Sequence, residues 1–81
     1  MIKRKLKIKN KLELCAMQAS LFVKTTNKFF SEIFIQMENI NVSGKSILGI
    51  MSLGIHKGSI ITISINGIDE EQAMKELKYI C

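Results

Sequence analysis

Ser46 is the residue whose position most clearly offers chemistry. It directly precedes a short apolar segment, where a serine hydroxyl can act as the N-cap of a helix and accept a hydrogen bond from a backbone N–H group. The N-terminus of a helix also favours negative charge, so a phosphoryl group on Ser46 would be stabilised there. We therefore predict that a helix begins after Ser46 and that Ser46 is a candidate phosphorylation site.

The segment that follows Ser46 is apolar on almost every side and ends at Gly54. A helix of about two turns cannot bury five large apolar side chains, so some of them must face a partner or water. One side should meet the core of the protein. We predict that the outer side carries Ile47, Leu48 and Met51.

Cys15 is a second candidate for chemistry because it directly precedes a segment with helical spacing, where the helix dipole can lower the pKa of a thiol. The alternative is a small apolar residue at a helix start. His56 is the only histidine and has no neighbouring carboxylate or cysteine, so we interpret it as a solvated loop residue. Cys15 and Cys81 have no zinc-ligand spacing and are expected to be free thiols. We expect no metal, no cofactor and no enzymatic turnover.

The composition indicates one domain spanning residues 1–81. No apolar run approaches the length of a transmembrane helix, and no signal peptide is recognisable, so we expect a soluble, cytoplasmic chain without a membrane partner. The net charge is +5, and basic residues crowd the first eleven positions. A nucleic-acid-binding strand is one interpretation of these residues. We favour a solvated edge strand, in which Lys3, Lys5 and Lys7 share one face, and expect no direct contact with nucleic acid.

The elements that must position these residues follow from apolar spacing. Alternation predicts strands over residues 2–8, 31–37, 40–42 and 59–66, and helical spacing predicts helices over residues 16–27, after Ser46 and from Asp69. Asp69 is the expected N-cap of the last helix, with Gln72 three residues later. The resulting order, βαββαβα, predicts an α+β sandwich of two layers, an antiparallel sheet with helices packed on one face.

With this order of elements, the chain resembles the HPr family of phosphocarrier proteins. The resemblance rests chiefly on residues 19–23 and 44–54, and extends to residues 57–58, 63–67 and 69–71. It implies an open-faced sandwich with a four-stranded antiparallel sheet in the order 1-4-2-3 and three helices on one face. It also implies a role in carrying phosphate from phosphoenolpyruvate, through enzyme I, to sugar-specific components of the phosphotransferase system.

The family's phosphoacceptor motif, His-Ala-Arg-Pro-Ala, reads Cys15-Ala16-Met17-Gln18-Ala19 in this chain. The histidine, the arginine that helps to hold the phosphate, and the proline are all replaced. A methionine has no charged donors to offer a phosphoryl group, so we do not expect phosphotransfer through a histidine. Phosphotransfer through Cys15 stays open as an alternative.

The family's second phosphorylation site is intact. The resemblance implies that Ser46 is phosphorylated by the HPr kinase/phosphorylase and that the product binds a LacI-type catabolite control protein, as in Crh-type regulatory paralogues that lack the histidine. The partner-binding surface we expect comprises Met17, Ser20, Leu21, Lys24, Lys45, Ile47, Leu48 and Met51. The leading hypothesis is a binding module switched at Ser46, and the alternative is a phosphocarrier that works through Cys15.

Overall fold

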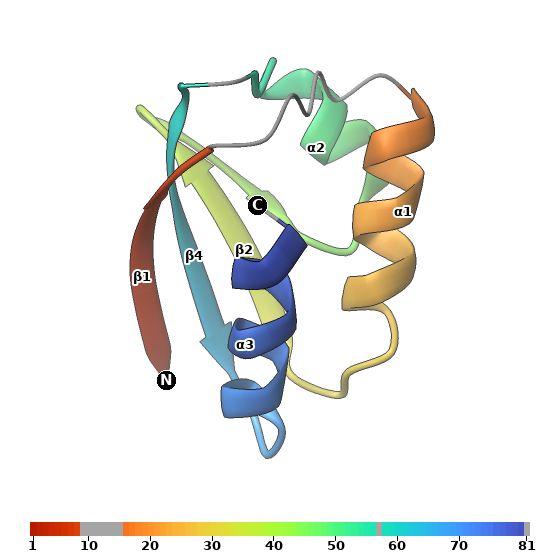
Figure 1. Cartoon of the computed structure of the whole chain (residues 1–81), viewed down its shortest axis with the longest axis vertical. Coiled ribbons are helices and arrows are strands. Elements are labelled where there is room, and N and C mark those ends of the chain that lie inside the picture. The colour runs from red at the N-terminus through yellow and green to blue at the C-terminus, as the bar shows by residue number, and fades with distance from the viewer. Residues whose placement is uncertain (9–15, 57, 81) are drawn as a thin grey trace.

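The computed structural model describes residues 1–8, 16–56 and 58–80, and their side chains except those of residues 16–18 and 80. The order of elements is the predicted one, βαββαβα (Figure 1). The elements are β1 (Ile2–Lys7), α1 (Ala16–Thr26), β2 (Glu32–Met37), β3 (Ile40–Ser43), α2 (Ile47–Ser52), β4 (Ile60–Asn66) and α3 (Glu70–Ile80). Each observed boundary lies within one or two residues of the prediction.

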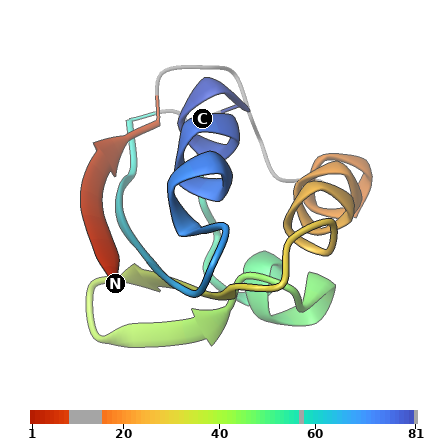
Figure 2. The same ribbon diagram turned by 90° about the horizontal axis from the view of Figure 1, so that it is seen from below.

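The four strands form one antiparallel sheet in the order β1-β4-β2-β3, as the resemblance implied. The first and last strands of the chain are therefore neighbours, and β4 lies between β1 and β2. The helices lie on one side of this curved sheet, as Figure 2 shows. The fold is the predicted two-layer sandwich.

The core lies between the sheet and the helices. Alternate residues of β2 and β4 face the helices and are almost fully buried, as their alternating apolar pattern predicted. The helices contribute Ala19 and Val23 of α1 and Ala73 and Leu77 of α3. The buried residues of the two strands are Ile33, Ile35, Ile61, Ile63 and Ile65.

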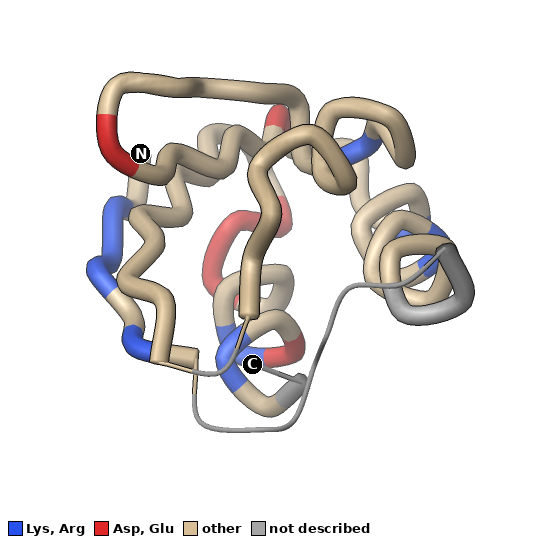
Figure 3. Tube along the Cα trace, turned by 90° about the horizontal axis from the view of Figure 1, so that it is seen from above, with Lys and Arg blue, Asp and Glu red and all other residues tan. Residues whose placement is uncertain are grey.

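Strand β1 is an edge strand with a solvated lysine face, as predicted. Lys3, Lys5 and Lys7 are exposed, whereas Leu6 is half-buried and Ile8 is buried. Figure 3 shows these basic residues gathered on one side of the molecule. Since an edge strand presents unpaired backbone groups, the row of lysines protects it against pairing with another chain.

The start of α3 lies where it was predicted, but the side chain of Asp69 has a different partner. Asp69 directly precedes α3, and its carbonyl accepts a hydrogen bond from Ala73 N, but its carboxylate does not cap the helix with Gln72. The carboxylate instead accepts hydrogen bonds from Phe30 N (2.9 Å), Ser31 N (3.0 Å) and the Ser31 hydroxyl. Asp69 is thus the N-cap by position, as predicted, but its carboxylate bonds to the loop before β2 and not to the first turn of the helix.

The described part of the chain contains no helix that is both long and apolar enough to cross a membrane.

Candidate functional site

Ser46 is the N-cap of α2, as its position predicted. Its backbone is extended (φ −110°, ψ 117°), its hydroxyl oxygen accepts a hydrogen bond from Gly49 N at 3.1 Å, and its carbonyl accepts one from Ile50 N at 3.0 Å. The helix ends where Gly54 adopts a positive φ of 62°, a conformation that favours glycine. The half-buried Ser46 hydroxyl is thus held at the start of a short, well-defined helix.

The turn that carries Ser46 is fixed from two sides. Gly44 N donates to Ile33 O of β2 at 2.7 Å, and a Cβ atom on Gly44 would lie only 2.6 Å from Ile33 Cγ2. The buried Thr26 hydroxyl at the end of α1 lies 2.8 Å from Gly44 O and 2.9 Å from Val23 O, so it shares its proton between them. Residue spacing does not predict this bond, because it joins residues that are 18 positions apart in sequence.

Apolar side chains beside this turn are exposed. Leu48 is 80% exposed, and Ile47 and Met51 are each 40% exposed, which confirms the predicted outer side of α2. Leu21 of α1, 57% exposed, belongs to the helix that packs beside α2. We call Leu21, Ile47, Leu48 and Met51 the α1–α2 apolar surface.

Three polar residues were predicted to belong to the same surface. Ser20 and Lys24 are exposed on α1, where a partner could reach them. Lys45 differs, because its ammonium group donates to Phe29 O at 2.7 Å and the residue is half-buried. Lys45 therefore also stabilises the loop before β2.

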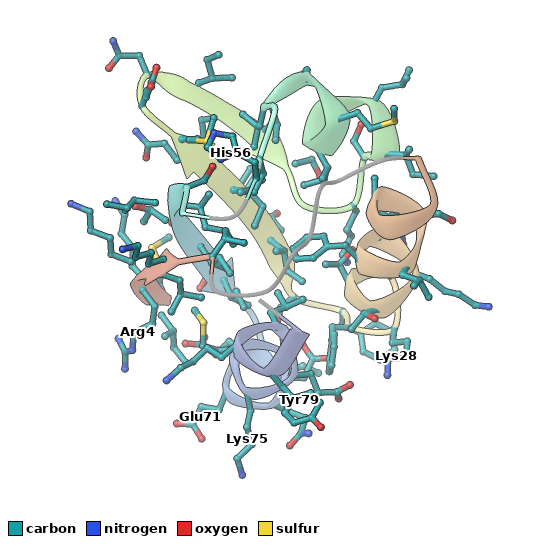
Figure 4. All side chains as sticks on the ribbon, turned by 45° about the horizontal axis from the view of Figure 1, so that its top comes forward. Arg4, Lys28, His56, Glu71, Lys75 and Tyr79 are labelled. Atoms are coloured by element: carbon teal, nitrogen blue, oxygen red, sulfur yellow. The ribbon has the colours of Figure 1, made fainter. Side chains whose placement is uncertain are left out.

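The remaining candidates divide into described and undescribed residues. Cys15 and the side chain of Met17 lie outside the described residues. His56 is exposed in the segment between α2 and β4, where Figure 4 labels it, and its backbone N–H donates to the Ser59 hydroxyl oxygen at 3.0 Å. Across the described ranges, no group of three or more His, Cys, Asp or Glu residues is arranged to hold a metal ion.

Residues 2–81 match the protein family described as "PTS HPr component phosphorylation site". The chain belongs to the HPr family. The HPr-like protein Crh of Halalkalibacterium halodurans is 46% identical to this HPr-family chain over 77 residues, which cover 95% of the chain and 92% of that relative.

Two solved structures of the family match the fold. The phosphocarrier protein HPr of Bacillus anthracis superposes on this chain with a TM-score of 0.92 and is 40% identical to it. The match covers 98% of this chain and 94% of the Bacillus anthracis protein. The solution structure of Crh, the Bacillus subtilis catabolite repression HPr, superposes with a TM-score of 0.71 at 34% identity. This match covers 98% of this chain and 94% of the Crh chain. The HPr family supplies phosphocarrier and regulatory proteins of the phosphotransferase system, not enzymes, and this chain has a role of that kind.

Proposed function

We propose that this HPr-family chain is a regulatory binding module of carbon catabolite control, switched by phosphorylation of Ser46. The observation that carries the proposal is the Ser46 N-cap next to the exposed α1–α2 apolar surface. A hydroxyl that can accept a phosphoryl group and a surface that can accept a partner lie at the same corner of the molecule.

Phosphorylation would change charge more than structure. A phosphoserine adds about −2 charge at neutral pH, and α2 has no acidic residue in its first turn to repel it. The positive end of the helix offsets part of that charge. The fold should therefore persist, and the signal should be electrostatic.

The chemistry of this corner fits a partner with arginine residues and an apolar groove. Arginines would bind the phosphoryl oxygens in forked, charge-assisted hydrogen bonds, and the groove would bury Leu48 with its neighbours. We propose a LacI-type catabolite control protein as this partner and the HPr kinase/phosphorylase as the enzyme that modifies Ser46. The similarity to Bacillus subtilis Crh, a catabolite repression HPr, supports this assignment.

We further propose that the chain does not transfer phosphate through a histidine. By resemblance, Cys15 stands at the family's phosphohistidine position and Met17 at the position of its supporting arginine. His56, the only histidine of the chain, belongs to a different segment, between α2 and β4. No element that precedes α1 supplies another histidine.

A second candidate function is a phosphocarrier that uses Cys15. Two similarities favour the carrier function. Residues 2–81 match a family defined by the phosphorylation site of HPr, and the fold matches that of a phosphocarrier protein HPr. In that case the phosphoryl group would pass from enzyme I to the Cys15 thiolate and then to sugar-specific components of the phosphotransferase system. A cysteine thiolate is nucleophilic enough for this step.

Two labelling reactions followed by mass spectrometry distinguish these functions. With ATP and HPr kinase, we expect phosphate on Ser46, lost in Ser46→Ala and retained in Ser52→Ala, a control in the same helix. Absence of label on Ser46 would overturn the switch. With phosphoenolpyruvate and enzyme I, we expect no label, whereas label on Cys15 that Cys15→Ala removes would establish the carrier function instead.

A further inference from the structure

A groove of about 390 Å³ lies between β1 and α3, away from the elements that carry Ser46. Its volume falls within the range of small-molecule sites. The groove is lined by two apolar residues, Ile2 and Met74, and by four charged ones, Arg4, Glu71, Lys75 and Lys78. Figure 4 shows Arg4 of β1 together with Glu71 and Lys75 of α3 on one side of the molecule.

Arg4 breaks the pattern of its strand. Alternate residues of β1 face the helix layer, and along this row Ile2 and Leu6 are half-buried while Arg4 between them is exposed. Its guanidinium donates one hydrogen bond, from Nη1 to Lys3 O at 3.1 Å. Since a guanidinium has five N–H donors, Arg4 retains donors that can bind an anion in a fork.

The charges of the groove are unbalanced. Arg4, Lys75 and Lys78 place three positive groups there, against the single carboxylate of Glu71. Lys28 forms an ion pair with Glu76 of α3 at 2.9 Å. Within the described residues, no ion pair involves Arg4, Lys75 or Lys78. The groove therefore has an excess of positive charge, and an anion bound in it would be attracted by these groups.

We propose that the β1–α3 groove binds a small organic or inorganic anion with at least two negative charges. Arg4 binds one anionic group in a fork, Lys75 and Lys78 bind the second, and Ile2 and Met74 contact the part of the ligand between them. Phosphoryl and carboxylate groups share this chemistry. Binding at the groove does not depend on phosphorylation of Ser46, because the two sites use different elements.

The experiment follows backbone amide signals of the unphosphorylated full chain by ¹⁵N NMR, while pyrophosphate or citrate is added at constant ionic strength. We expect saturable shifts at the amides of Arg4, Met74 and Lys75. In Arg4→Gln, and in a Lys75→Gln, Lys78→Gln double variant, binding should weaken at least about tenfold, as expected for lost charged hydrogen bonds. Lys5→Gln is the matched control, since it removes the same charge from the opposite face of β1 and should change binding by less than about twofold.

Saturation by pyrophosphate alone assigns the groove to phosphorylated ligands, saturation by citrate alone to polycarboxylates, and saturation by both to the shared chemistry. Shifts that grow linearly without saturation would overturn the proposal, and so would equal weakening in Arg4→Gln and Lys5→Gln. The same spectra report whether each variant is folded. A Ser46→Ala variant that binds normally separates this result from the proposed switch.

Discussion

The Asp69 carboxylate joins two loops that are far apart in sequence. It accepts hydrogen bonds from the backbone of Phe30 and Ser31 and from the Ser31 hydroxyl. Gly67 lies so close to Ser31 that a Cβ atom would collide with it. The loop between β4 and α3 is therefore attached to the start of β2 by a side chain and by close packing.

Protonation of Asp69 should weaken this attachment. The hydrogen bond from the Ser31 hydroxyl, with those from the Phe30 and Ser31 backbone, lowers the pKa of Asp69 below 3.8. A lowered pKa in the folded state stabilises the fold above pH 3.8, and this contribution is lost as the pH falls through the folded-state pKa.

We therefore predict that Asp69→Asn lowers the free energy of unfolding at neutral pH. We also predict that this free energy falls less steeply with decreasing pH in the variant than in the parent chain. Urea unfolding between about pH 7 and about pH 3 measures both effects. Glu32→Gln removes the same charge without these donors and serves as the control. An acid decline in Asp69→Asn as steep as that of the parent chain would contradict the role given to the carboxylate.

Thr26 should stabilise the Ser46 turn through its hydroxyl. Thr26→Val keeps the shape of the side chain but leaves the buried Gly44 carbonyl without this donor, so we predict a loss of about 1–2 kcal/mol of stability. Thr25→Val is the matched control, because the Thr25 hydroxyl bonds only to Leu21 O on the solvent side of α1. Equal losses in the two variants, measured by urea unfolding, would argue against a special role for Thr26.

Local contacts could be predicted from the sequence, and distant ones could not. The Ser46 cap involves an N–H three residues away, so a short pattern predicts it. Lys45 bonds to a carbonyl 16 residues earlier, and the Asp69 carboxylate bonds to an N–H 38 residues earlier. Their partners depend on how the elements pack, which residue spacing does not encode.

At the scale of elements, α2 divides its apolar residues between two tasks. Ile50 and Leu53 are 1% and 4% exposed and anchor the helix, whereas Leu48 is 80% exposed. Five apolar residues in so short a helix predicted that both faces would be apolar. The sequence also predicted the strands by alternation, but the sheet order came from the family resemblance, since alternation does not determine which strands pair.

This division predicts a large loss of stability for one alanine variant of α2 and almost none for another. Ile50→Ala should cost about 2–5 kcal/mol of stability, because it leaves a cavity in the core. Leu48→Ala should change stability by less than about 0.5 kcal/mol, because its side chain is solvated.

Leu48→Ala should instead weaken binding of the Ser46-phosphorylated chain to a catabolite control protein by about tenfold or more. Calorimetric titration measures this loss, and Ser52→Ala, an exposed position of the same helix, serves as the control. Unchanged affinity in Leu48→Ala would exclude the α1–α2 apolar surface from the interface.

At the scale of the whole molecule, the positive charge of β1 protects the free edge of the sheet against pairing with a second copy of the chain. The exposed lysines of β1 follow the free edge of the sheet and repel a second copy of the chain. We predict that a Lys3→Thr, Lys5→Thr, Lys7→Thr variant forms oligomers at lower protein concentration than the parent chain does. Light scattering after size exclusion measures the molar mass at each concentration.

The control for this prediction removes the same charge from the helices, at Lys24, Lys75 and Lys78, by substitution with Gln. It should associate no more than the parent chain. Equal association in both variants would attribute the effect to net charge and not to the edge of the sheet.

The sheet order β1-β4-β2-β3 also determines how late in synthesis the first strand can pair. Strand β1 leaves the ribosome at the start of synthesis but has no partner until β4, more than fifty residues later, has been made. The β2–β3 hairpin and the bond between α1 and the Ser46 turn join residues that are closer in sequence. Until β4 inserts, β1 lacks its partner and β2 lacks one of its two partners, and such unpaired strand edges make an incomplete fold prone to aggregation.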